Sequence, residues 1–115
     1  DDMMKIRGQN LWPEAVDRII FAAGDIEEYA GTVQVDEKGR EAVDVAVEFR
    51  PSARLPAQTR AERIGELAGE LQRALNIRME VREAAYLSLP RFEFKVRRWT
   101  DKRRADRNFV RYVQN

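Results

Sequence analysis

The sequence predicts an α+β domain with β-α-β-β-α-β element order, in which two main helices pack against a small, mostly antiparallel sheet. Three observations predict this fold class. Two stretches place apolar residues at helical spacing, and others alternate apolar and polar residues as half-buried strands do. The length of 115 residues suits one domain that buries roughly two-thirds of its unfolded surface.

The first helix is expected to begin at Pro13, because proline suits the first helical position. Glu14 and Asp17 favour the positive end of the helix dipole, and Gly24 suits the helix stop. If the preceding segment KIR (residues 5–7) pairs as a strand, it supplies the first strand of the predicted order. The apolar face of the helix consists of Val16, Ile19, Ile20 and Ala23.

A hairpin is expected next. Residues 29–35 (YAGTVQV) predict one strand, residues 36–40 (DEKGR) a turn, and residues 42–50 (AVDVAVEFR) a second strand. The second strand is the clearer one, because every second residue is apolar and would face a core. Its inward set is Val43, Val45, Val47 and Phe49, alternating with Asp44, Ala46 and Glu48.

The second helix is expected to begin at Thr59, which has capping-box spacing to Glu62, and to stop near Asn76. Gly65 and Gly69 lie inside it and cost about 1 kcal/mol each relative to alanine. Their spacing leaves two interpretations open: close packing on the sheet, or two tolerated exposed glycines. The apolar face consists of Ile64, Leu67, Ala68, Leu71 and Leu75.

Two further elements follow. Residues 77–83 (IRMEVRE) alternate again and predict a strand with Ile77, Met79 and Val81 facing inward. Residues 100–115 are a candidate final helix, capped by Thr100 or Asp101, whose expected role is packing. Its docking residues would be Ala105, Phe109 and Tyr112 or Val113.

The composition excludes several kinds of chemistry. The chain has no cysteine and no histidine, which excludes disulfides, thiolate or imidazole metal sites, and nucleophiles or bases of these two types. The absence of cysteine fits a reducing compartment, and we expect a cytoplasmic protein. No apolar run approaches the roughly 20 residues of a membrane span, so no membrane partner is expected.

Charge is distributed unevenly along the chain. Residues 1–90 hold 12 Lys/Arg against 17 Asp/Glu, whereas residues 91–115 hold 9 against 3. The cationic end therefore either has a phosphate-bearing partner or is attracted to the acidic body of the same domain. Aromatic residues interleave with its cations, as in proteins that bind single-stranded nucleic acid. A strand with Phe92 and Phe94 inward and its charges in water is the commoner meaning of such a run.

Two segments become specific when they are considered together. Near one end the chain contains DDMMKIRGQNLWPEAVD, and near the other LPRFEFKVRR. Together they resemble the small C-terminal domain of adenylate-forming enzymes, with the phenylacetate–CoA ligase group as the best fit. The family's crossover motif is Gly-Arg-x-Asp-Asp followed by Lys/Ile-x-Arg-Gly-x-Asn-x-x-Pro, and this chain would begin within it. The resemblance covers about residues 1 to 102.

The closing motif of that group is Pro-Arg-Ser-Glu-Gly-Lys, and here it is Pro90-Arg91-Phe92-Glu93-Phe94-Lys95. The sequence departs from the motif at Phe92 and Phe94, while Lys95 keeps its register. The resemblance implies that Lys95 is the catalytic lysine that stabilises the charge developing when a carboxylate attacks ATP. Arg91 and Arg97 are the phosphate-proximal candidates.

The resemblance also implies a two-step reaction. Enzymes of this type form an acyl-adenylate and pyrophosphate, and then transfer the acyl group to the thiol of coenzyme A. The small domain rotates between the steps about a hinge, which Asp1 matches. Rotation would withdraw Lys95 and bring the loop Arg7-Gly8-Gln9 to the coenzyme A channel, where glycine suits close passage of the thiol-bearing arm.

We therefore expect residues 1–115 to be the mobile C-terminal domain of an AMP-forming acid–CoA ligase, inactive when excised, with residues 103–115 an extension of unassigned role. Its partners would be a large N-terminal adenylation domain and a small carboxylic acid. ATP, Mg²⁺ and coenzyme A would serve the full-length enzyme, with none held tightly by this domain alone.

Two other classes of protein remain as alternatives. One is a stand-alone basic module that binds RNA or single-stranded DNA through residues 91–111, for which salt-dependent oligonucleotide binding would be diagnostic. The other is a small-molecule regulatory domain, which a ligand would stabilise without any large domain. The paired end motifs favour the ligase over both, so nucleic acid is not the expected partner.

Overall fold

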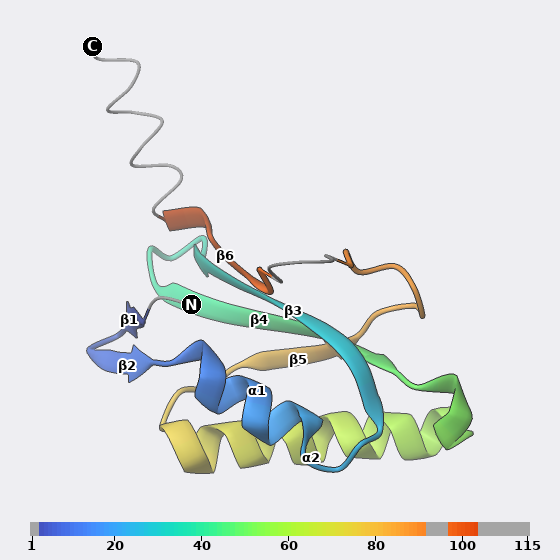
Figure 1. Cartoon of the computed structure of the whole chain (residues 1–115). Helices are drawn as coiled ribbons and strands as arrows, with labels where there is room; N and C mark the ends of the chain where they lie inside the picture. The colour runs from blue at the N-terminus through green and yellow to red at the C-terminus, as the bar shows by residue number, and fades with distance from the viewer. Residues whose placement is uncertain (1–2, 92–96, 104–115) are drawn as a thin grey trace.

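The computed structural model describes residues 3–91 and 97–103. It is an α+β domain in which two helices lie on one side of a four-stranded sheet, as Figure 1 shows. A separate two-stranded hairpin precedes the first helix. The elements in chain order are β1 (Met4–Ile6), β2 (Gln9–Leu11), α1 (Pro13–Phe21), β3 (Ile26–Val35), β4 (Glu41–Phe49), a 3-10 turn (Pro51–Ala53), α2 (Ala57–Leu75), β5 (Glu80–Glu83) and β6 (Trp99–Asp101).

The main sheet has the strand order β5-β4-β3-β6. Its centre is the predicted antiparallel hairpin, in which Tyr29 pairs with Val47 and Val33 with Val43. The short β5 and β6 are parallel to their neighbours, so most of the paired length is antiparallel. The predicted fold class and element order are confirmed.

The core lies between the sheet and the helices. Both helices bury the faces that their sequence periodicity predicts, through Val16 and Ile20 on α1 and Leu67 and Leu71 on α2. These side chains meet the inward set of the hairpin. The buried cluster also includes Met4, Ile6, Leu11, Ile26, Tyr29, Val33, Val43, Val45, Val47, Phe49, Ile77 and Met79.

Two strands differ from the sequence expectation. Lys5 and Ile6 of the KIR segment lie in strand β1, whereas Arg7 lies in the turn, and β1 pairs with Gln9–Leu11 in a hairpin of its own and not with the main sheet. Trp99–Asp101 forms the edge strand β6, where the sequence suggested only the cap of a final helix. A three-residue strand is too short to show alternation, and its parallel pairing depends on long-range contacts. Most of the predicted final helix lies in residues 104–115, outside the described residues.

The second helix begins earlier than predicted. It starts at Ala57, with Pro56 in an extended conformation at the N-cap, and Thr59 makes no capping hydrogen bond. The stop at Asn76 is confirmed, with φ of 57° and an N–H that donates to the Gln72 carbonyl. A Cβ at Gly65 would meet no atom within 4 Å, so this glycine is a tolerated exposed residue. Within residues 3–91 and 97–103, no helix is long and apolar enough to cross a bilayer.

Candidate functional site

The β1–β2 turn carries the predicted Arg7-Gly8-Gln9 loop. Ile6 pairs with Gln9, so Arg7 and Gly8 are the two central residues of a tight hairpin turn. Their φ angles are 49° and 80°, the positive values that a type I′ turn requires. Glycine adopts such a φ at no steric cost, and no atom lies within 4 Å of the position a Gly8 Cβ would take. The tip of the turn is therefore open backbone.

Glu41 fixes this turn to the main sheet. The Arg7 amide donates to Glu41 Oε1 over 2.6 Å, and Arg7 Nε donates to the Glu41 carbonyl over 2.9 Å. The amide hydrogen bond from Arg7, followed by that from Arg103, holds the pKa of Glu41 below its ordinary value.

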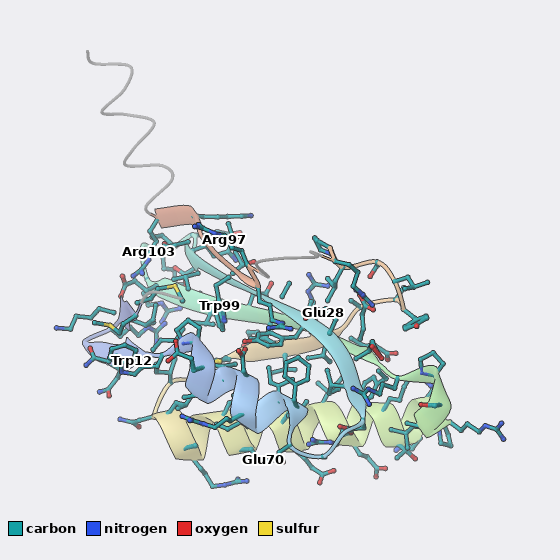
Figure 2. All side chains as sticks on the ribbon, in the orientation of Figure 1. Trp12, Glu28, Glu70, Arg97, Trp99 and Arg103 are labelled. Atoms are coloured by element: carbon teal, nitrogen blue, oxygen red, sulfur yellow. The ribbon has the colours of Figure 1, made fainter. Side chains whose placement is uncertain are left out.

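Arg103 ties the same turn to the end of β6. Its guanidinium pairs with Glu41 and Asp101 and donates to the Lys5 carbonyl over 2.9 Å. Figure 2 shows this side chain at the end of the molecule where the β1–β2 hairpin lies. Residues from both ends of the described chain thus meet at Glu41.

Glu48 on β4 is the centre of a second cluster. Its side chain is fully buried, although it occupies a position that alternation assigned to solvent. Oε1 accepts from the Leu87 amide (2.9 Å) and Arg91 Nη2 (2.5 Å), and Oε2 accepts from the Leu89 amide (2.7 Å) and Arg91 Nη1 (3.0 Å). The bidentate bond from Arg91 is the main cause that lowers the pKa of Glu48 to about 2. The carboxylate therefore holds the chain from Leu87, which has a φ of 68°, to the arginine of the Pro-Arg motif.

Glu28 on β3 holds the chain on the other side of the lysine motif. It is 7% exposed and accepts a 2.5 Å hydrogen bond from Arg98 Nε. The Arg98 guanidinium also lies over the Phe21 and Tyr29 rings, 5.0 and 5.6 Å from their centroids. The Arg98 carbonyl accepts from the Gly31 amide over 2.8 Å, which starts the pairing of β6 with β3.

Trp99 and Tyr29 connect β6 to β3 and α1 through two successive hydrogen bonds. The indole Nε1 donates to the Tyr29 hydroxyl over 3.1 Å, and that hydroxyl donates to Asp17 on α1. Burial, and then the bond to Asp17, raise the pKa of Tyr29. Trp99 sits over Gly31, where an added Cβ would come within 2.5 Å of the indole ring. Trp99 and Glu28 both lie along β3 in Figure 2.

The structure distributes the predicted site residues over two places. Arg7, Gly8 and Gln9 form the turn beside Glu41, whereas Arg91 is paired with Glu48. Arg97 is exposed. Lys95 and Asp1 lie outside the described residues. Of residues 3–91 and 97–103, no group of His, Cys, Asp and Glu could hold a metal ion.

Sequence reasoning missed the carboxylates that organise these places. Glu48 was predicted as a solvated strand position, and Glu28 and Glu41 lay just outside the predicted strands 29–35 and 42–50, whereas β3 begins at Ile26 and β4 at Glu41. Nothing local marks these three residues as buried or paired. The charge asymmetry along the chain was the available signal for these ion pairs. One of its two explanations was that the basic end is attracted to the acidic body of the same domain. Arg91, Arg98 and Arg103 from that end are all paired with carboxylates of the body. This arrangement does not favour a nucleic-acid surface, which needs its cations free for phosphates.

A comparison with family models matches residues 8–103 to the AMP-binding enzyme C-terminal domain. The chain belongs to this family. The match runs in one continuous stretch from Gly8 of the β1–β2 turn, through Arg91 and Arg98, to the end of the edge strand β6 and Arg103. No curated protein sequence is a significant match to this C-terminal domain.

Solved structures agree with the family. A crystal structure of a domain of phenylacetate–coenzyme A ligase from Bacteroides vulgatus has a TM-score of 0.78 at 20% identity, covering 88% of this chain and 92% of that one. A 2-hydroxyisobutyryl-CoA ligase in complex with 2-HIB-AMP and CoA, in the thioesterification state, has a TM-score of 0.80 at 24% identity over 96% of this chain. The same ligase in a postadenylation state gives 0.76 at 27% identity over 99%. In both cases this C-terminal domain spans 24% of the ligase chain.

Proposed function

We propose that this domain is the mobile part of an ATP-dependent acyl– or aryl–CoA ligase resembling phenylacetate–CoA ligase, and that it supplies different residues to the two half-reactions. The observation that carries the proposal is the likeness to a CoA ligase described in both a postadenylation and a thioesterification state. One domain that serves both states must present two surfaces in turn. Two separate anchored elements, the β1–β2 turn and the segment after Arg91, suit that task.

Lys95 would act in the adenylation step. There an anionic carboxylate attacks the α-phosphate of ATP, an acyl–phosphate bond forms and pyrophosphate leaves. An ammonium placed where negative charge develops lowers the barrier to this attack. Lysine is suited to the role because its charge is compact and sits on a long stem. Arg91 and Arg97 remain candidates for contacts near the phosphates.

The Arg7-Gly8-Gln9 turn would act in the thioester step. After rotation about Asp1, it would line the channel through which the pantetheine arm of coenzyme A reaches the acyl-adenylate. The open space around Gly8 supports this role, because a ligand can approach the backbone there without meeting a side chain. The two hydrogen bonds from Arg7 to Glu41 would keep the turn rigid during that approach.

The remaining components belong to the full-length enzyme. ATP, Mg²⁺, coenzyme A and a small carboxylic acid would bind with a large N-terminal adenylation domain, and this domain alone would hold none of them tightly. We propose a cytoplasmic location for this enzyme.

The test uses the full-length parent enzyme and measures the half-reactions separately. Acid-dependent pyrophosphate release, with a panel of aryl and acyl acids, reports adenylation; thioester formation from pre-formed acyl-adenylate reports transfer. Lys95→Ala should lower adenylation by about 100-fold or more and leave transfer within about twofold. Gly8→Ala should do the reverse, because a side chain would enter the open space and would strain a turn that requires a φ of 80°. If Lys95→Ala leaves adenylation unchanged, the lysine assignment is wrong.

A further inference from the structure

We propose that Glu48 and Glu28 are positioning residues for adenylation: by holding Arg91 and Arg98, they fix both ends of the segment that carries Lys95. The inference rests on the proposed function, because it assumes that Lys95 acts in that step. Neither glutamate belongs to the sequence motifs that suggested the ligase. Each acts through an arginine and not by contact with a substrate.

The Glu48 anchor lies at the entrance of the segment. Among the described residues, the hydrogen-bond donors to its two carboxylate oxygens all belong to residues 87–91. Solvent does not reach these oxygens, because the side chain is 0% exposed. A bidentate arginine–carboxylate pair fixes orientation as well as distance. The Arg91 side chain is itself 38% exposed, so this ion pair lies at the surface of the domain. Glu48 therefore holds Leu87, Leu89 and Arg91, which precede the segment, against β4.

The Glu28 anchor lies at the exit of the segment. Arg98 is held by Glu28 at 2.5 Å and by Asp17 at 3.8 Å, and is 22% exposed. The aromatic rings of Phe21 and Tyr29 cover its guanidinium. The very next residue, Trp99, enters the sheet as the first residue of β6. Glu28 therefore holds Arg98, which follows the segment, against β3.

The two anchors are coupled through the sheet. Glu28 and Glu48 are register partners across β3 and β4. Like charges directly opposite each other in a sheet destabilise it, so each carboxylate needs its arginine. The charges of both glutamates raise the pKa of Arg91, that of Glu48 first and that of Glu28 more weakly, as expected for neighbouring groups. One rigid hairpin thus holds both ends of the segment.

This arrangement matters for Lys95 because a lysine side chain is long and its position depends on its backbone. In any chain, fixing two positions reduces the conformational freedom of the residues between them. A displacement of about 1 Å at a catalytic group can cost about 100-fold in rate. Loosening either anchor should therefore slow the step that uses Lys95 and spare the step that does not.

The experiment compares Glu48→Gln, Glu28→Gln and Arg91→Lys with Lys95→Ala in the full-length enzyme. Glutamine keeps the size of the side chain but removes its charge, and lysine cannot make the bidentate bond. The matched control is Asp25→Asn, which loosens a comparably buried pair with Arg63, at 2.7 Å, that does not hold this segment. Adenylation and transfer are measured separately, and thermal unfolding shows that each variant is folded.

We expect the anchor variants to lower kcat for adenylation by about 10- to 100-fold, with KM for ATP and acid changed far less. Transfer from pre-formed acyl-adenylate should stay within about twofold, as should both activities of Asp25→Asn. Combining Glu48→Gln with Lys95→Ala should give no further loss beyond Lys95→Ala alone, because the anchor acts through the lysine.

The inference is overturned if the anchor variants adenylate normally while Lys95→Ala does not, or if both half-reactions fall equally. A loss that multiplies with that of Lys95→Ala would also overturn it. Should Glu48→Gln fail to fold, Glu28→Gln carries the test, because its partner Arg98, unlike Arg91, is not a candidate for phosphate contact. If Lys95→Ala itself adenylates normally, the proposed role of Lys95 is wrong. This outcome differs from a failure of the anchor inference, in which Lys95→Ala is slow and the anchor variants are normal.

Discussion

Replacing Glu48 with glutamine should destabilise the domain far more than its position on a strand suggests. Each carboxylate oxygen accepts two hydrogen bonds, one from a backbone amide and one from Arg91. Glutamine turns one of these oxygens into an NH₂ group, which would face two donors and accept from neither. The substitution also leaves the guanidinium without its buried counter-charge.

The magnitude follows from two estimates. The pKa of about 2, against an ordinary 4.5, corresponds to about 3 kcal/mol at about 1.4 kcal/mol per pH unit. Breaking a buried pair costs about 3–5 kcal/mol, but the 38% exposure of Arg91 lets water take over part of the interaction. We therefore expect a loss of about 2 kcal/mol at neutral pH. With a urea m-value of about 1.5 kcal/mol/M, the midpoint should fall by about 1.3 M.

The effect should depend on pH in one direction. Because folding lowers the pKa of Glu48, its contribution is complete above about pH 4.5 and is lost as the pH falls towards 2. Urea unfolding of the wild type and Glu48→Gln at several pH values measures this. The difference in unfolding free energy should be largest at neutral pH and should narrow below pH 4.5. An equal difference at all pH values, or none at neutral pH, would refute the role of the charge.

Two further predictions concern the packing of β6. Gly31→Ala should lower the free energy of unfolding by about 1–3 kcal/mol, because its Cβ would meet the Trp99 ring at 2.5 Å. Gly65→Ala, with no atom within 4 Å of its Cβ, should instead stabilise α2 by about 1 kcal/mol. Urea unfolding followed by tryptophan fluorescence compares the two variants, and equal effects would contradict the contact between Gly31 and Trp99. The raised pKa of Tyr29 means that its contribution is present below pH 10 and is lost as the pH rises beyond it. Alkaline unfolding monitored by phenolate absorbance should therefore show a steep loss of stability above pH 10 that Tyr29→Phe lacks, and identical curves would show that the buried hydroxyl is unimportant.

Local patterns were enough to predict much of this fold. The apolar faces of both helices and the alternation of β4 depend only on the period of one element, which neighbouring residues display. The stop of α2 at Asn76 is likewise local, as is the glycine of the β1–β2 turn. Even the ligase family was accessible, because its two end motifs are short and contiguous.

The anchors could not be predicted in this way. Glu48 and Arg91 are 43 residues apart, and Glu28 and Arg98 are 70 apart. The alternation that correctly placed Val47 and Phe49 in the core placed Glu48 in water, because it cannot show that residues 84–91 cover that face.

The amino-acid sequence by itself therefore determined which elements form, which of their faces are apolar and which family the domain resembles, since each of these is written in residues close together along the chain. Only the tertiary structure decided that two glutamates on paired strands hold the arginines on either side of the Lys95 segment. The physical reason is that burial and ion pairing depend on register and on what packs above a strand, and both are set by contacts between residues distant in the chain.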